Sequence, residues 1–387
     1  MRPAGGALDH DVVVIGAGLA GAATAWQAAG RGLNVLVLEQ FGPEHARGSS
    51  HGSARIVRRA YADALYTQLT GRAFELWREA ELAAGATLLN HLGALDFGPD
   101  RRVDQIVANL SGAGVAHEVL SPTEAMHRWP GMVFDTPVVH HSEAGTVDAE
   151  TAVTTFLDLA RGHGAQVRFD QPVTGVSVAS NHASATVRLG EQEIRTRAVV
   201  ITAGAWLPDL TRGMVLDPVL PELAITQEQT FHFPRTDPSQ DPWPSTIHAA
   251  EGFEIYHLSG GRDGGSGLDR KVAEHHHGRP TSATGRDGLI DPAGTERVLA
   301  YVRRWLPGLH PEPANATTCL YTTTPTQNFL VDRIGPVVLC SACSGHGAKF
   351  APLIGEWTTA LLTGTGRVPE RFALAAHGPG ARRSWSL

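Results

Sequence analysis

Near the N-terminus, the pattern of apolar and polar positions predicts two strands separated by a tight turn and a helix. The first apolar run is Val12–Ile15, and a second run, Val35–Leu38, follows a stretch rich in alanine. Short apolar runs bounded by turn residues are typical of buried strands, and small residues between them suit a helix that packs closely on a sheet. The pattern therefore predicts a strand, a helix and a second, parallel strand.

Three glycines and a glutamate give this unit its chemistry. Gly16, Gly18 and Gly21 form a G-x-G-x-x-G motif directly after the first strand, and Glu39 ends the second strand. In dinucleotide-binding proteins the first glycine permits the turn, the second lets backbone approach a pyrophosphate, and the third lets the helix pack closely on the sheet. The helix N-terminus favours phosphate, and the carboxylate binds ribose hydroxyls. We expect a dinucleotide site, and the motif alone does not separate FAD from NAD.

Further along, the pattern predicts helices and strands in alternation. An amphipathic helix is expected at Ala64–Ala84, with Gly85 as its C-terminal cap. The region from Pro218 to Leu309 is rich in strand patterns and then in loop residues, and the tail Ala375–Leu387 is expected to be loosely held. Other helices are expected to start at Ser121 and to cover residues 148–160 and 351–362, with strands at 88–97, 166–169, 173–178, 185–189, 198–202 and 337–339.

Composition narrows the class of protein. The 387 residues are enough for two domains, and 42% hydrophobic with 18% charged residues is typical of a globular enzyme. A net charge of −7 argues against nucleic-acid and anionic-membrane partners. Three cysteines argue for a reducing compartment, and no apolar run approaches the roughly 20 residues that span a bilayer. We therefore expect a cytoplasmic protein without a membrane partner.

Two segments are suited to attract an anion. After the second strand, Arg55, Arg58 and Arg59 follow His51 and form an anion-attracting group; Arg55 and Arg58 would share one face if this segment were helical. Near the C-terminus, the glycine-rich turn Ser344–Phe350 opens a helix, and its free N–H groups again suit an anion or the electron-rich end of a flavin.

Five motifs in order carry a resemblance to a known family: VVVIGAGLAG…VLE, SSHGSARIVRRAY, VITAGAW, CLYTTT and SGHGAKF. Over nearly its whole length the chain resembles the monomeric sarcosine oxidase and N-methyltryptophan oxidase family of FAD-dependent amine oxidases. The resemblance implies an α/β fold, with a Rossmann-like FAD domain of the p-hydroxybenzoate hydroxylase or D-amino-acid oxidase type and a mixed-sheet α+β catalytic domain. The implied FAD domain is discontinuous (1–90, 146–216 and 319–387), and the catalytic domain comprises 91–145 and 217–318.

The resemblance also implies how FAD is held. Cys319, in CLYTTT, matches the cysteine whose sulfur bonds to the flavin 8α-methyl group, a reaction that needs a thiolate. Cys340 and Cys343 have C-x-x-C spacing, but we expect them to pack within a strand and a turn. The other implied cofactor-binding residues are Gly16, Gly18, Gly21, Glu39, His51, Arg55, Val173, Gly345, Gly347 and Lys349.

Substrate-binding and catalytic residues follow from the same resemblance. Arg58 and Lys349 match the two cations that hold the substrate carboxylate, and Tyr321 matches a substrate-binding tyrosine. Lys271 matches the lysine that activates dioxygen, although Asp269–Arg270 are two extra residues before it. The remaining implied catalytic residues are Arg55, Tyr256, His275 and His346.

The implied reaction is oxidation of a secondary amino acid, N-methyl or cyclic, to an imine, with dioxygen as acceptor and hydrogen peroxide as product. We expect a monomer whose partners are the amino acid and dioxygen. One alternative is an oxidase of a pipecolate- or piperideine-carboxylate-like ring, which a broad pocket around Phe253, Tyr256 and His257 would favour. Another is a non-catalytic FAD-binding protein. No metal site is expected at His275–His277, because adjacent side chains point in different directions.

Overall fold

Parallel pairing joins the first strand to segments far along the chain. β1 (His10–Ile15) lies between β2 (Val35–Leu38) and β12 (Gln192–Ile201), and β20 (Val337–Ser341) runs parallel to the end of β12. This eight-stranded sheet is completed by β9 (Gln166–Arg168), β10 (Gly175–Val178), β11 (Ala185–Leu189) and β19 (Leu330–Ile334). The computed structural model describes residues 8–214, 219–239, 242–264, 267–378 and 380–381.

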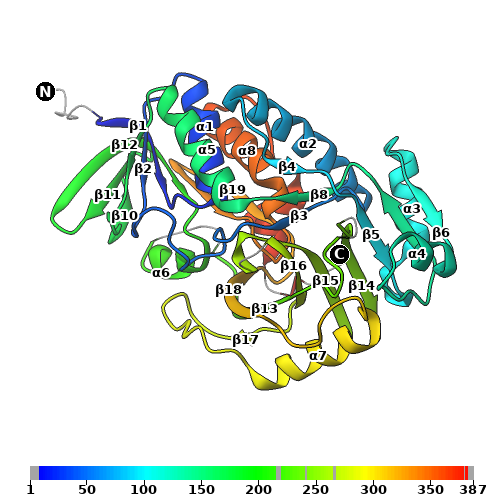
Figure 1. Ribbon diagram of the computed structural model, residues 1–387. Coiled ribbons are helices and arrows are strands. Elements are labelled where there is room, and N and C mark those ends of the chain that lie inside the picture. The colour runs from blue at the N-terminus through cyan, green and yellow to red at the C-terminus, as the bar shows by residue number, and fades with distance from the viewer. Residues whose placement is uncertain (1–7, 215–218, 240–241, 265–266, 379, 382–387) are drawn as a thin grey trace, which may run out of the picture.

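Four helices pack together on one side of this sheet (Figure 1): α1 (Leu19–Gly30), α2 (Ala64–Ala84), α5 (Ala149–Gly162) and α8 (Ala351–Thr363). The strands alternate their side chains between two cores, because successive residues of a strand point to opposite faces. Val12 and Val14 pack in the core shared with α1 and α5, whereas Val13 and Ile15 pack on the other face. Both faces are apolar, as expected for a parallel sheet.

A second sheet is mixed and has nine strands: β5 (Ala94–Phe97), β6 (Glu118–Leu120), β7 (Val138–His141), β13 (Ala224–Phe233), β14 (Ser245–Ala250), β15 (Phe253–Gly261), β16 (Gly267–Glu274), β17 (Arg279–Pro280) and β18 (Asn315–Thr323). α7 (Pro292–Trp305) covers one face of it (Figure 1), where Val298 and Trp305 join the core formed by Phe231, Phe233 and Val272. The other face contributes to the cavity described below.

Shorter elements complete the described chain. A three-stranded sheet is formed by β3 (Arg55–Val57), β8 (Gly145–Val147) and β4 (Leu89–Asn90). The remaining α-helices are α3 (Val103–Gly112), α4 (Pro122–Arg128) and α6 (Leu207–Thr211). The 3-10 turns are η1 (Pro99–Arg101), η2 (Gly204–Trp206), η3 (Arg262–Gly264), η4 (Ala348–Phe350), η5 (Glu370–Phe372) and η6 (Leu374–His377).

The predicted dinucleotide turn has the expected geometry. Gly16 has φ +98°, a backbone conformation that favours glycine. A Cβ on Gly21 would lie 1.8 Å from the carbonyl oxygen of Gly16, so only glycine lets α1 approach the turn this closely. The predicted helix Ala64–Ala84 is confirmed, and Gly85 caps it in the left-handed conformation at φ 62°. The α/β fold class is therefore confirmed: parallel pairs join β9, β2, β1, β12 and β20 in the first sheet, antiparallel pairs add β10, β11 and β19 to it, and the second sheet is mixed.

Several local expectations were wrong. Arg55 lies in strand β3, so the condition under which Arg55 and Arg58 would share a helical face is not met. The loop-rich region before Leu309 contains α7, which begins with the N-cap Asp291 followed by proline. The start of the tail is held in place: His377 is buried and hydrogen-bonded to Thr326. The rest of the tail beyond residue 381 lies outside the described residues.

The two sheets draw on alternating parts of the chain. Strands of the first sheet fall within residues 10–38, 166–201 and 330–341, and strands of the second within 94–141 and 224–323. β18 crosses the predicted boundary between residues 318 and 319. The division into FAD and catalytic domains stays a prediction.

Candidate active site

A cavity of about 1020 Å³ is lined by residues of both large sheets. Its wall includes the Gly16–Ala20 turn after β1 on one side and Ile247, Tyr256, Leu258 and Lys271 of the mixed sheet on another. The turn after β12, Ala203–Trp206, also lines it. The cavity thus lies at the carboxyl ends of the parallel strands, where open α/β sheets bind their ligands.

One end of the cavity fits the adenosine and pyrophosphate of a dinucleotide. Gly18 is the N-cap of α1 and has no side chain to fill the approach to the helix N-terminus. Glu39 accepts hydrogen bonds from the backbone N–H of Ala17 at 2.8 Å and of Phe41 at 3.1 Å. Burial raises the pKa of Glu39, but hydrogen bonds from His45 and these two N–H groups outweigh it and leave the pKa lowered. A fixed, ionised carboxylate therefore faces the place where a ribose would lie. Val173 lines the same cavity.

Two cations converge on one aromatic ring. The Arg58 guanidinium lies 4.2 Å from the centroid of the Tyr61 ring, and the Lys349 Nζ lies 5.7 Å from the same centroid. Both side chains line the cavity and are nearly buried, with Arg58 4% and Lys349 5% exposed. Arg58 Nη1 has no hydrogen-bond partner within the described residues, and Lys349 Nζ donates to the carbonyl oxygen of His346 at 2.7 Å. The pair is placed to receive an anion.

Burial and mutual repulsion act on both cations. The pKa of Lys349 is held well below its usual value, first by burial and then by the charges of Arg58 and Arg101. Burial also lowers the pKa of Arg58, with Arg101 adding to the effect. Arg101 is itself buried and donates to Asp96 at 2.7 Å. The two cations thus lie near the buried ion pair of Arg101 and Asp96, which the sequence reasoning missed.

A second group of charges surrounds the predicted oxygen-activating lysine. Lys271 lines the cavity from β16, and its Nζ lies 3.3 Å from Oδ2 of Asp263. Arg55, Cys319 and His51 line the same part of the wall. Burial, Arg55 and other nearby cations lower the pKa of His51 to about 3, so this imidazole is neutral near pH 7. These four predicted residues are brought together as expected.

Strand alternation resolves the two-residue insertion before Lys271. In β16, Arg270 and Lys271 point to opposite faces. Arg270 is buried outside the cavity and donates to His257 Nδ1 at 2.9 Å and to the carbonyl oxygen of Trp243 at 2.8 Å. The insertion therefore leaves Lys271 on the cavity face.

Aromatic side chains and a glycine close the site between the two charge groups. Tyr256 and Tyr321 line the cavity, and Tyr321 Oη lies 3.5 Å from Nδ1 of His275. Gly345 has φ +75°, and a Cβ there would lie 2.5 Å from the Tyr321 ring and 2.6 Å from the His275 ring. The glycine-rich turn therefore touches the tyrosine and histidine directly. His346, in the same turn, is within 3.2 Å of the Tyr61 hydroxyl through its Nδ1.

Other expectations have mixed outcomes. The pocket proposed around Phe253, Tyr256 and His257 is wrong in part: Tyr256 lines the cavity, whereas Phe253 and His257 point to the opposite face of β15. Cys340 packs in a buried core and also lines the cavity, as do Cys343 and Gly347. No group of three metal-ligating side chains occurs within the described ranges.

Sequence reasoning missed several charged residues of the wall and one compositional signal. Asp263, Glu254 and Arg286 are among the charged residues that line the cavity, and Arg286 belongs to none of the five sequence motifs. The signal is the lysine content: all 387 residues include two lysines, Lys271 and Lys349, and both line this cavity. A chain that otherwise uses arginine for its cations places its lysines only here.

Known proteins match this chain along most of its length. The model of the family "FAD dependent oxidoreductase" matches residues 11–361. The peroxisomal sarcosine oxidase of Homo sapiens is 31% identical over 363 residues, which cover 89% of this chain and 90% of that protein. The monomeric sarcosine oxidase of Streptomyces avermitilis is 32% identical over 374 residues, covering 92% and 94%. The N-methyl-L-tryptophan oxidase of Yersinia pestis is 28% identical over 367 residues, covering 90% and 94%.

Solved structures share the fold. NikD, described as an unusual amino acid oxidase essential for nikkomycin biosynthesis, superposes with a TM-score of 0.82 at 23% identity over 95% of this chain and 98% of that chain. The L-proline dehydrogenase of P. horikoshii has a TM-score of 0.82 at 20% identity, covering 97% and 100%. No helix among the described residues has the length and apolar character needed to cross a membrane. The chain belongs to the FAD-dependent oxidoreductase family that includes the sarcosine oxidases and N-methyl-L-tryptophan oxidases, and it is a flavin-dependent amine oxidase acting on CH–NH bonds.

Proposed function

We propose that this enzyme oxidises a secondary amino acid, N-methyl or cyclic, and passes the electrons to dioxygen with release of hydrogen peroxide. The observation that supports the proposal is that cations in one cavity form two separate groups. Arg58 and Lys349 converge on Tyr61 at one place, and Lys271 stands with Arg55 and Cys319 at another. A substrate anion and a flavin ring then have distinct positions.

Arg58 and Lys349 bind the substrate carboxylate in this proposal. A buried carboxylate needs charge-assisted hydrogen bonds to offset its lost hydration. The unpartnered Nη1 of Arg58 supplies a donor, and Lys349 supplies a point charge beside it. Tyr256 and Tyr321 then enclose the amine, which must be neutral to be oxidised. When bound, FAD would accept two electrons and a proton from the C–H bond next to the amine nitrogen; the N–H proton goes to solvent, leaving an imine that water hydrolyses.

Lys271 serves the second half of the cycle. Its ammonium stabilises the negative charge that develops on dioxygen as it takes up electrons, because a fixed charge in a site with little water needs no reorganisation. His51 stays neutral beside it and adds no competing charge. Overall, dioxygen takes up two electrons and two protons and leaves as hydrogen peroxide.

Cys319 is proposed as the covalent attachment point of FAD. Its thiol faces the cavity from β18, with Arg55 and Arg286 nearby. Burial raises the pKa of Cys319, whereas Arg55 and Lys271 lower it. The two cations favour the thiolate, whose sulfur would replace one hydrogen of the 8α-methyl group; the two electrons released would go to the flavin and from there to dioxygen, giving hydrogen peroxide.

A peroxide-release screen of the purified yellow protein tests the proposal. The panel contains sarcosine, bulkier N-methyl amino acids, proline and pipecolate, each with its carboxamide as control. We expect turnover of at least one N-methyl or cyclic acid and much weaker turnover of the matching amide. Turnover of ring substrates alone would select the cyclic imino-acid alternative. Bound FAD that no acid in the panel reduces anaerobically would contradict the proposal and support the non-catalytic alternative.

A further inference from the structure

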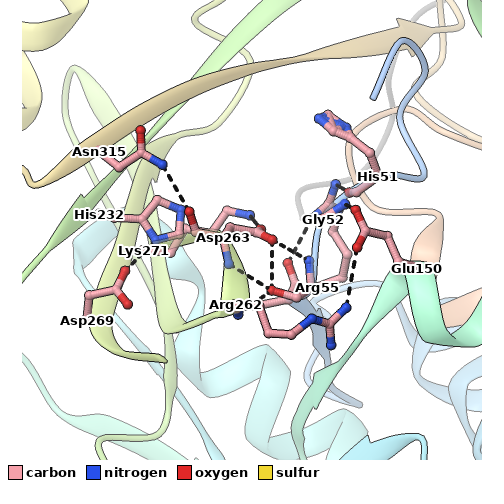
Figure 2. A network of polar contacts seen from close by, with 12 residues as sticks. His51, Gly52, Arg55, Glu150, His232, Arg262, Asp263, Asp269, Lys271 and Asn315 are labelled. Carbon is pink, nitrogen blue, oxygen red and sulfur yellow. Dashed lines mark hydrogen bonds and ion pairs between the residues drawn. The ribbon is translucent and has the colours of Figure 1, made fainter. Parts of the chain in front are cut away.

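Asp263 is the one carboxylate that pairs with Lys271 in the described part of the cavity, and no predicted role includes it. It lies in η3, the turn between β15 and β16, and its Oδ2 is 3.3 Å from Lys271 Nζ. Figure 2 shows Asp263 between Lys271 on one side and the His51–Arg55 segment on the other. The carboxylate therefore bridges the mixed sheet and the loop that follows the dinucleotide-binding unit.

Ser53 holds this carboxylate in place. Asp263 Oδ1 accepts hydrogen bonds from the Ser53 backbone N–H and hydroxyl, both at 2.8 Å. Ser53 Oγ in turn accepts from the backbone N–H of Arg262 at 2.6 Å. Burial raises the pKa of Asp263, but Lys271 and Ser53 outweigh it and leave the pKa lowered. Asp263 is thus ionised near neutral pH and has little freedom to move.

A second set of contacts ties the same turn to the helical layer. Arg262 binds Asp148 and lies 3.3 Å from Glu150, while Glu150 accepts from the backbone N–H of Gly52 at 2.8 Å. Asn315 of β18 donates to the carbonyl oxygen of Asp263 at 2.9 Å. Figure 2 shows the contacts that join Gly52, Glu150 and Arg262 and that join Asn315 to Asp263, and they fix the backbone on both sides of the carboxylate.

The other groups that face Lys271 are either positively charged or neutral, so they do not balance its charge. Arg55 of β3 is a like charge, His51 is neutral, and Cys319 of β18, once bonded to FAD as proposed, is an uncharged thioether. Lys271 is also nearly buried. Without Asp263, the ammonium would lie in a poorly hydrated site beside a guanidinium, which favours loss of its proton.

We propose that Asp263 is a positioning residue that keeps Lys271 protonated and in place for the reaction with dioxygen, and that Ser53 orients Asp263 for this task. The inference rests on the proposed function, because it takes Lys271 as the cation that serves dioxygen. The chemistry is unchanged: dioxygen takes up two electrons and two protons, one of the protons coming from solvent, and leaves as hydrogen peroxide.

The role of Asp263 predicts in which direction the rate of reoxidation should change with pH. Burial, then Arg55, lower the pKa of Lys271 to about 8, and Asp263 opposes this. Reoxidation by dioxygen should be fast below that pH and slow as pH rises through it. Losing an opposite charge at this distance should lower the pKa by about 1–3 units. With a drop of about 2 units, Asp263→Asn would be roughly tenfold slower at pH 7 and nearly normal at the acidic end of its range.

Two measurements on the FAD-loaded enzyme test this. Stopped-flow reoxidation is followed against pH, and the Lys271 amine is titrated directly by NMR with lysine carrying ¹³C at the ε position. Two lysines give two signals, which Lys271→Met and Lys349→Arg assign. The variants are Asp263→Asn, Ser53→Ala and, as a matched control, Asp158→Asn, whose exposed carboxylate pairs with Arg161 at 2.7 Å.

We expect Asp263→Asn to lower both the Lys271 midpoint and the pH at which reoxidation fails, with anaerobic flavin reduction changed less than about twofold. Ser53→Ala should shift both in the same direction by less, and Asp158→Asn should shift neither. An unchanged Lys271 midpoint in Asp263→Asn, or in Ser53→Ala if Asp263→Asn is not recovered folded, overturns the inference. So does a loss of reoxidation that is equal at every pH. If Lys271→Met reoxidises normally, the proposed role of Lys271 fails, while the NMR midpoint still decides whether Asp263 holds its proton.

Discussion

Replacing Arg58 with glutamine should change both the affinity for a carboxylate and the protons taken up on binding. Arg58 is 4% exposed and has an unpartnered Nη1, so the variant removes at least one charge-assisted hydrogen bond. Such a bond contributes about 1.5–3 kcal/mol, which corresponds to roughly one to two orders of magnitude in Kd. We expect a loss of that size for an acid and almost none for its carboxamide.

The proton count follows from Lys349. Its pKa is held well below the usual value by burial, Arg58 and Arg101. A bound carboxylate favours the ammonium and raises the pKa of Lys349, so binding should take up a proton at pH values between the pKa of Lys349 in the substrate-free protein and its higher pKa in the complex. Within that window the Kd should rise by about tenfold for each pH unit, and on either side of it neither effect should occur. Arg58→Gln removes one of the repelling charges, raises the pKa of Lys349 and should reduce the uptake.

Calorimetry with an unreactive analogue measures both quantities. Methoxyacetate places an ether oxygen where a secondary amine would be, and methoxyacetamide is its neutral control. Titrations in buffers of different ionisation enthalpy give the number of protons bound. Lys349→Met should abolish the uptake, and Arg197→Gln, an exposed arginine of β12 outside the cavity wall, should change nothing. Equal binding of acid and amide by the wild type, or the same Kd in Arg58→Gln, would refute the reasoning.

Three further outcomes follow from the site. Cys319→Ala should leave all the yellow colour in the supernatant after acid precipitation, whereas the wild type should retain it in the pellet. Because the pKa of Cys319 is raised, attachment of FAD to freshly folded protein should speed up as pH rises. An attachment rate independent of pH would contradict this. Gly345→Ala should cut turnover strongly, because the added Cβ would meet Tyr321 and His275 at 2.5–2.6 Å; unchanged steady-state rates would count against the contact. Glu254 lines the cavity and its charge acts on Arg58, so Glu254→Gln should favour N-methylaspartate over N-methylalanine in kcat/KM relative to the wild type, and an unaltered ratio would rule out such repulsion.

The dinucleotide-binding unit could be predicted from the sequence because its signals are local. The turn at Gly16, the close approach at Gly21 and the carboxylate of Glu39 each depend on a few neighbouring residues. The long amphipathic helix α2 was predictable for the same reason, since its apolar spacing and both caps lie within one segment. Residues with such local signals were placed correctly.

The missed features depend on contacts between distant segments. The role proposed for Asp263 depends on its contacts with Lys271 and Ser53, and Ser53 is 210 positions away in the chain. The buried pair Asp96 and Arg101 resembles ordinary surface charge until the fold covers it. α7 was overlooked because its apolar residues face the mixed sheet across a narrow stripe, and the preceding loop residues dominate the local composition. A family resemblance supplied the paired cations, but not the charges behind them.

The parallel order of the first sheet has a consequence for how the chain folds. Val13 of β1 pairs with Val199 of β12, and Val199 pairs with Val337 of β20. The sheet therefore cannot close during synthesis until β20 has left the ribosome, and until then one edge of β12 has unpaired backbone groups. Contacts over such separations form slowly. The glycine turn after β1 is made long before β12 and β20, which complete the sheet that supports it, so FAD should enter as a late step that locks an assembled sheet.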